Sequence, residues 1–333
     1  MRTCCIIIVM VKLIITENEA DQRLDRFLRK YFRKATLGFI YKLIRKDVKL
    51  NGRRAGEDTM LRRGDELTIY IPEEKAAELS ADTRRKTSKR QFRIAYEDDN
   101  ILIADKPWGL LTHGDSHEKK NTLVNQVCGY LQDNGEYNPS RERSFTPAPV
   151  NRLDRNTTGL VIFGKNAAAL RALTKSIRER DNIEKYYLTI VCGELKEPLF
   201  LDDSLRRDTD RNISEISRDG DGKSAFTYVK PIAAGKKFSL VEVRIFTGRT
   251  HQIRTHLAHA GFPLAGDSKY GDPAVNRRLK KEGITTQLLH ACRLEFKGCI
   301  EGLEYLEGKR AEASPPPDFR RAQKLLIPDT NSR

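Results

Sequence analysis

The chain has 333 residues, of which 38% are hydrophobic and 32% are charged, and its formal net charge is +15. This length allows two domains with separate cores, and the composition is that of a soluble protein rather than of one embedded in a membrane. The positive charge favours a polyanion as partner. The charge is concentrated in the first 90 residues, which hold 22 Lys and Arg and 13 Asp and Glu, a net +9 (22 minus 13) that leaves +6 for the rest of the chain.

The cysteines and the apolar start of the chain indicate an intracellular protein. The six cysteines have neither the Cys-x-x-Cys spacing of metal sites nor the density of a secreted, disulfide-rich fold, so we expect reduced thiols, a cytoplasmic location and no structural metal. Residues 1–15 are mostly apolar, but Lys12 interrupts them and they are too short to cross a bilayer, so we expect a strand and no membrane segment. The sequence leaves open whether translation starts at Met1 or at Met10.

Two helices and a small sheet are predicted in the N-terminal region. Apolar residues repeat at helical spacing in residues 20–34, and Asp21 can cap this helix. A second amphipathic helix follows in residues 36–47, with basic side chains on its outer face. An Asn51-Gly52 turn and alternating apolar residues between 67 and 71 then predict strands. The inward positions of the two helices are Leu24, Phe27, Leu28 and Tyr31, then Ile40, Leu43 and Ile44.

These N-terminal elements resemble the α-L RNA-binding module found in a small-subunit ribosomal protein and in several RNA-modifying enzymes. The resemblance covers about residues 13–72, through the stretches RLDRFL, IYKLIRKDVKLNG and RRGDELTIYI. It implies that the second helix and the adjoining loop bind structured RNA through phosphate contacts. The implied contacts are Lys42, Arg45, Lys46 and Lys49.

We expect four regions along the chain. The N-terminal α-L RNA-binding module takes residues 1–75, and a linker of residues 76–91 follows, because the segment there changes from acidic to basic without apolar periodicity. Strands and helices are mixed in order over residues 92–313, which favours an α+β catalytic domain over a regular doubly wound sheet. Residues 314–333 are expected to be a loosely attached C-terminal tail.

The stretch PVNRLDRNTTGLVIFGK, residues 149–165, places Asp154 between Arg152 and Arg155 just before an apolar strand. Asn166 can cap the helix that follows. The carboxylate therefore precedes a rigid strand and helix, which is the kind of support that a functional group needs. An isolated group of charged residues of this kind is usually a solvated surface turn. Whether Asp154 is such a turn residue or a functional carboxylate therefore depends on evidence from other segments.

Two later segments supply further candidates. Residues 186–195, YYLTIVCGEL, predict a strand that carries Tyr187 on one face. Residues 240–272 predict a strand, a turn and a helix that holds Arg254 away from its apolar stripe. The histidines of this helix lack the carboxylate pattern of a zinc site, so no metal is expected.

In order and spacing, NRLDRNTTGL, KYYLTIVCG and TGRTHQIRTHLAHAG with GDSKYG resemble the signature segments of the RluA-type family of RNA pseudouridine synthases. AYEDDNILIADKPWGLLTH and LLHACRLEF match flanking segments of that family, so the likeness spans roughly residues 92–300. The implied fold is a mixed, mostly antiparallel sheet with a central cleft. The implied reaction is the isomerisation of uridine to pseudouridine in structured RNA, and it requires no cofactor.

The resemblance also implies roles for particular residues. Asp154 maps onto the catalytic aspartate of the family, Tyr187 onto its active-site tyrosine and Arg254 onto the basic residue paired with the aspartate. Arg152 lies in the catalytic signature. The expected RNA contacts in the same signatures are Arg155, Arg249, His251 and Gln252.

The chemistry of the isomerisation suits these residues. An ionised carboxylate can attack either ribose carbon 1′ or base carbon 6, and a neighbouring arginine favours its charged form. The sequence does not choose between the two routes. The target nucleotide must leave its stack, so an aromatic surface such as Tyr187 is expected against the uracil. The family usually has His at the position of Asn151 and Ser at that of Thr158, which leaves the fine positioning of the aspartate open.

The expected partner is RNA, and the protein is expected to act as a monomer. Large-subunit ribosomal RNA is favoured, with transfer RNA as the alternative. A non-catalytic RNA-binding or ribosome-assembly factor would account for the basic N-terminal module, but it has no use for Asp, Tyr and Arg in three distant segments. A metal-dependent RNA hydrolase needs clustered carboxylates or ligand histidines, which the sequence lacks.

Overall fold

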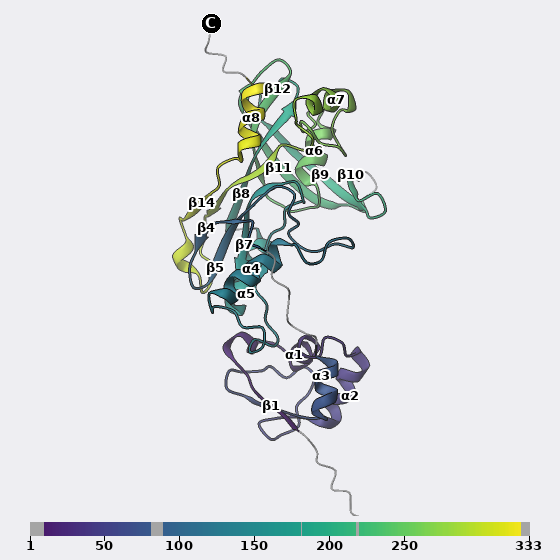
Figure 1. Cartoon of the computed structure of the whole chain (residues 1–333), viewed down its shortest axis with the longest axis vertical. Helices are drawn as coiled ribbons and strands as arrows, with labels where there is room; N and C mark the ends of the chain where they lie inside the picture. The colour runs from purple at the N-terminus through teal and green to yellow at the C-terminus, as the bar shows by residue number, and fades with distance from the viewer. Residues whose placement is uncertain (1–9, 81–88, 181, 218–219, 328–333) are drawn as a thin grey trace, which may run out of the picture.

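The computed structural model describes residues 10–80, 89–180, 182–217 and 220–327. A small N-terminal module lies at one end of an elongated molecule, and a large domain built on one sheet forms the rest (Figure 1). Each part has its own buried hydrophobic cluster. The expected α+β class is confirmed in both parts.

The N-terminal module packs three helices on a three-stranded antiparallel sheet. The sheet order is β1-β3-β2, and the buried faces of α1 and α2 fill its core as the periodicity predicted. Thr36 caps α2 by accepting a hydrogen bond from the backbone of Phe39. Asp21 does not cap α1, since it adopts a left-handed backbone conformation and pairs with Arg171 of the large domain. The elements are β1 Met10–Ile14, α1 Leu24–Tyr31, α2 Leu37–Asp47, β2 Val48–Leu50, β3 Glu66–Tyr70 and α3 Glu73–Leu79.

The start of the expected linker is helical. Helix α3 buries Ala76 and Leu79 in the core of the N-terminal module, so the prediction that residues 76–91 are all linker is wrong at its beginning. The mixed charge of this segment hid two buried side chains spaced three residues apart, which are too few to show a helical period. Residues 81–88 of the expected linker lie outside the described residues.

The large domain is organised around an 11-stranded sheet. Its main path is β10-β9-β11-β12-β8-β13-β7-β5-β4, in which β13 and β7 are parallel and the other pairs are antiparallel. The mixed, mostly antiparallel sheet is therefore confirmed. The strands are β4 Arg93–Glu97, β5 Ile101–Lys106, β6 Ala148–Pro149, β7 Thr158–Gly164, β8 Ile183–Cys192, β9 Leu199–Asp208, β10 Ile213–Ile216, β11 Lys223–Ala234, β12 Phe238–Ile245, β13 Leu289–Phe296 and β14 Arg310–Glu312.

Helices cover both faces of the sheet. Alternate residues of β5 and β7 point to opposite faces, so these apolar strands are buried on both sides. Helices α4 Leu123–Asp133 and α6 Gln252–His259 share one hydrophobic cluster, and α5 Ala167–Glu179 belongs to the cluster across the sheet. Asn166 caps α5 as predicted, by accepting a hydrogen bond from the backbone of Ala169.

The C-terminal segment is packed against the domain rather than loosely attached. Residues Pro317–Leu326 form α8, whose Phe319 and Ala322 are buried in a cluster with Leu279 of α7 Pro273–Lys281. The prediction of a tail over residues 314–333 is therefore wrong for the helical part, because the run of prolines before α8 begins a helix at Pro317 instead of an irregular segment. Residues 328–333 lie outside the described residues.

The two parts of the molecule touch through polar side chains. Asn18 donates a hydrogen bond to Glu142 at 2.8 Å and accepts one from the backbone of Ala167 at 2.9 Å, and Gln22 donates to Ser144 at 3.0 Å. Within the described residues, no helix is both long enough and apolar enough to cross a membrane.

Candidate active site

Asp154 lies in the loop between β6 and β7, at the point where the chain turns into the sheet. Its backbone carbonyl accepts a hydrogen bond from Thr157 at 3.1 Å, and this turn leaves the side chain 30% exposed. Just beyond the turn, Gly159 runs so close to β13 that a Cβ atom would come 2.1 Å from the carbonyl oxygen of Ala291. The loop is thus held against a strand that it could not approach with a side chain at this position.

Arg254 connects Asp154 to a second, fully buried carboxylate. From α6, its Nη1 donates to Asp154 Oδ2 at 2.9 Å, while Nε and Nη2 donate to Asp267 Oδ2 and Oδ1 at 2.7 and 2.8 Å. These carboxylates raise the pKa of the Arg254 guanidinium against the opposing effect of burial. The guanidinium is therefore permanently charged and fixed in direction by the bidentate pair with Asp267.

Tyr187 lies on β8, a central strand of the sheet, between Val243 of β12 and Ala291 of β13. Its side chain is buried and lines the same small cavity as Asp154 and Arg254. Burial, and to a smaller extent the charge of Asp154, raise the pKa of the Tyr187 hydroxyl. The phenol therefore stays protonated near neutral pH and offers a ring and a hydrogen-bond donor.

His251 lies directly beside the carboxylate. Its backbone is left-handed, its Nε2 is 3.7 Å from Asp154 Oδ2, and its Nδ1 is 2.9 Å from the hydroxyl of Tyr270. Burial lowers the pKa of His251 to about 4, and the attraction of Asp154 only partly opposes this shift. The imidazole is therefore neutral near pH 7, so it adds no positive charge beside Asp154.

A cavity of about 470 Å³ opens in front of Asp154 and Tyr187. Burial and the neighbouring Arg180 lower the pKa of Lys185 to about 8, and burial with Arg180 also lowers the pKa of Arg249. Positive charges placed this close together repel one another, and a polyanionic ligand in the cavity would offset that repulsion. Six basic residues line the cavity: Arg152, Arg178, Arg180, Lys185, Arg207 and Arg249.

Four of these cations carry no signal in the sequence that points to the site. Arg178 and Arg180 stand at the end of α5, where basic residues are ordinary for a helix C-terminus, and Lys185 and Arg207 lie on strands whose neighbours only the sheet order reveals. Lys106 was not predicted to be part of the site either. It is fully buried and its ammonium donates to the carbonyls of Pro107, Leu110 and Arg155 at 3.1, 2.7 and 3.0 Å.

The predicted RNA contacts of the signature segments separate into two groups. Arg249 and His251 lie at the cavities around Asp154, and Arg155 is exposed and 3.6 Å from Asp115. Gln252 lines the smaller of these cavities too, but its side chain is buried and its amide is hydrogen-bonded to Thr247, Thr227 and the backbone of Arg249 and Phe226. These hydrogen bonds hold the turn before α6, and a direct RNA contact by Gln252 stays a prediction.

The two departures from the family pattern have partners of their own. Asn151 donates to the carbonyl of Leu160 at 3.2 Å and accepts from the backbone of Ile162 at 2.8 Å, so it braces the Asp154 loop against β7. The Thr158 hydroxyl is 2.8 Å from Nδ1 of His290, whose Nε2 is 2.8 Å from the carbonyl oxygen of Ala313. Asn151 also lines the cavity in front of Asp154, whereas Thr158 does not line that cavity and supports the start of β7 from the β13 side.

The four basic side chains expected to contact RNA in the N-terminal module are all exposed. Three of them lie on the exposed face of α2, and the fourth lies on β2, which follows this helix directly. One of them, Lys49, lies over the ring of Tyr70 at 5.4 Å from its centroid. These residues are Lys42, Arg45, Lys46 and Lys49.

The fold and this site define the class of protein. A partly exposed aspartate held by an arginine, a buried tyrosine and a cationic cavity on a mixed sheet are parts suited to an enzyme that acts on a nucleic acid. Residues 100–259 match the family model described as RNA pseudouridylate synthase. The chain belongs to this family and is an RNA pseudouridine synthase, an isomerase.

Relatives match over most of the chain. The ribosomal large subunit pseudouridine synthase C of Vibrio vulnificus (strain CMCP6) is 33% identical, covering 85% of this chain and 87% of its own length. An uncharacterized RNA pseudouridine synthase of Bacillus subtilis (strain 168) is 30% identical over 93% and 95% of the two chains. The solved structure of the human RNA pseudouridylate synthase domain containing 4 protein shares the fold, with a TM-score of 0.54 and 20% identity over 70% of this chain and 92% of that one.

Proposed function

We propose that this enzyme converts specific uridines of large-subunit ribosomal RNA to pseudouridine, with Asp154 as the nucleophile. The observation that carries the assignment is the 2.9 Å contact of Arg254 with Asp154, beside Tyr187 and at the edge of the cationic cavity. Several relatives are named ribosomal large subunit pseudouridine synthase C, which supports a ribosomal substrate over transfer RNA. A ribosomal substrate also agrees with a cytoplasmic location.

In this proposal the exposed Asp154 oxygen attacks the flipped uridine. Attack at ribose carbon 1′ or at base carbon 6 forms a covalent adduct and allows the bond between carbon 1′ and nitrogen 1 to break. The base then turns and carbon 5 joins carbon 1′ as Asp154 leaves. Carbon 5 loses its proton and nitrogen 1 gains one, so the atoms balance. Reactant and product are isomers, so no oxidant, reductant or phosphate is consumed.

The surrounding residues have separate parts in the reaction. Arg254 holds one carboxylate oxygen of Asp154, so the other oxygen is directed to the substrate. The Tyr187 ring forms a buried wall for the uracil, and stacking on such a wall stabilises a base outside its helix. Arg152 and Arg249, together with the other basic side chains that line the cavity, neutralise the phosphates around the target uridine.

The N-terminal module is proposed to hold a second part of the same RNA. Its exposed cations Lys42, Arg45, Lys46 and Lys49 give an electrostatic surface that does not depend on RNA sequence. We propose residues 1–80 as this module, since α3 packs into its core, and residues 92–327 as the catalytic domain. The complete protein would act as a monomer.

The first prediction tests the nucleophile. Asp154→Asn keeps the size of the side chain but removes the attacking charge, so pseudouridine formation on a ribosomal RNA fragment should fall to background in a single-turnover assay. RNA affinity should stay within about tenfold, which is about 1.4 kcal/mol. Asp133→Asn, at the exposed end of α4, is the matched control and should retain activity. Substantial turnover by the Asp154→Asn enzyme would remove this residue from the mechanism.

A further inference from the structure

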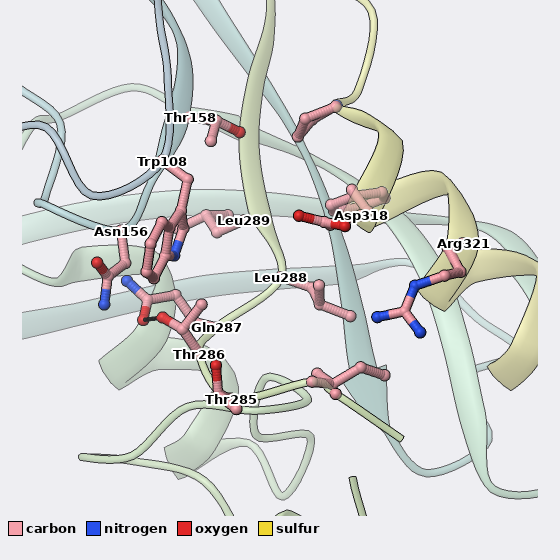
Figure 2. A pocket seen from close by; sticks show the side chains of 14 residues that line it. Trp108, Asn156, Thr158, Thr285, Thr286, Gln287, Leu288, Leu289, Asp318 and Arg321 are labelled. Atoms are coloured by element: carbon pink, nitrogen blue, oxygen red, sulfur yellow. Dashed lines mark hydrogen bonds between the residues drawn. The ribbon is translucent and has the colours of Figure 1, made fainter. Parts of the chain in front are cut away.

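A second cavity, of about 190 Å³, lies next to the Asp154 loop and has an exposed tryptophan on its wall. Trp108 is the only tryptophan of the chain, and it is 59% exposed. Figure 2 shows its ring at one side of the cavity and Asp318 and Arg321 of α8 at the other. A solvent-exposed aromatic side chain at the edge of a cavity is typical of a binding surface.

Trp108 is presented on a rigid turn. The buried ammonium of Lys106 bonds the carbonyls of Pro107 and Leu110 on both sides of the tryptophan, and Gly109 supplies the positive φ of 78° that the turn requires. The same ammonium bonds the carbonyl of Arg155 at 3.0 Å. One buried group therefore ties the Trp108 turn to the loop that carries Asp154, and the ring can meet a ligand with little loss of conformational entropy.

Amide and apolar groups complete the wall around the tryptophan. Asn156 and Gln287 lie beside the Trp108 ring (Figure 2), and Leu288 and Leu289 line the cavity between the ring and α8. An aromatic face with neighbouring amides can stack a planar heterocycle and bond its edge. At about 190 Å³ the cavity is smaller than the roughly 300–1,000 Å³ of sites for drug-sized ligands.

The position of this cavity relates it to the substrate. Asn156 follows Asp154 by two residues, and Leu289 lines both this cavity and the smaller one that contains Asp154, Tyr187 and Arg254. A ligand bound at Trp108 is thus separated from the reaction centre by one loop and one strand. The polymer that occupies that centre is RNA, whose next unpaired base is the nearest planar group available.

We propose that the Trp108 cavity binds one unpaired nucleobase of the RNA substrate, close in sequence to the target uridine, by stacking on Trp108. The proposal rests on the proposed function, because the RNA is placed by the reaction centre. Such a subsite extends recognition beyond the flipped uridine, and it selects RNA in which a base near the target is also free of pairing.

The single tryptophan allows a direct test in the full chain. Asp154→Asn protein should be titrated with an RNA hairpin that has the target uridine in an unpaired loop, while the fluorescence of Trp108 is recorded. Stacking of a base on the indole should quench this fluorescence in step with binding. The same hairpin with abasic sites on both sides of the uridine should bind more weakly and quench less. Equal quenching by both hairpins, or none by either, would overturn the proposal.

Substitutions of Trp108 give a second, independent measurement. Trp108→Ala should weaken hairpin binding by about 5- to 150-fold, the range that corresponds to losing one base stack. Trp108→Phe keeps a stacking face and should recover most of the affinity. Tyr305→Ala is the control, because Tyr305 is also a partly exposed aromatic but lies outside both cavities. Unchanged binding by Trp108→Ala would overturn the proposal.

The test separates this inference from the proposed function. Pseudouridine formation by the unmodified enzyme on the hairpin or on ribosomal RNA tests the function alone. If the enzyme is active and the Trp108 variants behave as the unmodified protein does, only the subsite fails. If Trp108 fluorescence changes with protein concentration in the absence of RNA, a second copy of the chain covers the cavity, and that result also overturns the proposal.

Discussion

At the scale of single residues, the site is organised by one guanidinium that two carboxylates share. Asp267 takes Nε and Nη2 of Arg254, so only Nη1 remains for Asp154. The three charges sum to a net negative one, which means that Arg254 does not neutralise Asp154 on its own. Its contribution is therefore largely geometric: it holds one oxygen of the nucleophile in place and leaves the other free to react.

The role of the Tyr187 hydroxyl can be separated from that of its ring. Because burial keeps this hydroxyl protonated, we expect the ring to matter more, so Tyr187→Phe should keep much of the activity and Tyr187→Ala should lose most of it. Single-turnover rates with saturating RNA measure both variants. Equal and nearly complete losses would instead indicate that the hydroxyl transfers a proton.

His251 predicts how stability depends on pH. Its folded pKa of about 4 lies below the ordinary 6.5, so the unfolded chain binds more protons between these values and stability falls as the pH drops through that window. The loss is at most about 3 kcal/mol. His251→Asn, which tolerates the left-handed backbone, should remove part of this acid loss in urea unfolding measured at pH 7 and pH 4.5. An identical pH dependence in both proteins would contradict this explanation.

At the scale of elements, the sheet places the catalytic groups and the helices hold them. Tyr187 comes from β8, Asp154 from the loop before β7, and Arg254 from α6. Strand β13 lies between β8 and β7, and its Ala291 pairs with Tyr187 on one side and with Gly159 on the other, so the start of β7 after the Asp154 loop and Tyr187 are separated by one strand. Helix α8 closes the opposite side of this region through Phe319, which also lies near the ring of His290.

The packing of α8 gives a prediction about stability. Phe319→Ala removes a buried ring and should cost about 3–5 kcal/mol of unfolding free energy, measured by urea denaturation. Leu325→Ala on the same helix changes a side chain that is 48% exposed and should stay within about 0.5 kcal/mol of the unmodified protein. Two equally small effects would show that α8 contributes little to the fold.

At the scale of the whole molecule, two groups of basic side chains lie far apart in the sequence. One lines the cavity in front of Asp154, and the other lies on the outer face of α2. A structured RNA that reaches both would be held at two points, and the N-terminal module would then contribute mainly sequence-independent affinity.

The salt dependence of RNA binding measures the contribution of the N-terminal module. Replacing its four exposed cations by Gln should flatten the slope of log affinity against log salt by about 3 to 4 units, since each lost phosphate contact removes about 0.7 to 0.9. A control with the same change of charge replaces four exposed lysines of the large domain and should change the slope less. An equal change in both variants would argue against a specific clamp. The first set is Lys42, Arg45, Lys46 and Lys49; the control set is Lys236, Lys237, Lys280 and Lys281.

The sequence by itself determined the family, the α+β class and the three segments that meet at the site, because these depend on local patterns and on motif order. The inner faces of α1 and α2 and the Asn166 cap of α5 were also predictable, since a helix period and a cap are local signals. Only the tertiary structure decided which side chains from distant parts of the chain contact one another at the site. Three features show this. Asp267 is the second partner of Arg254, Lys106 bonds the carbonyl of Arg155, and cations of β8 and β9 line the cavity near Asp154. Each brings together residues that lie apart in the chain. Their pairing depends on the strand order and on burial, which no local pattern encodes.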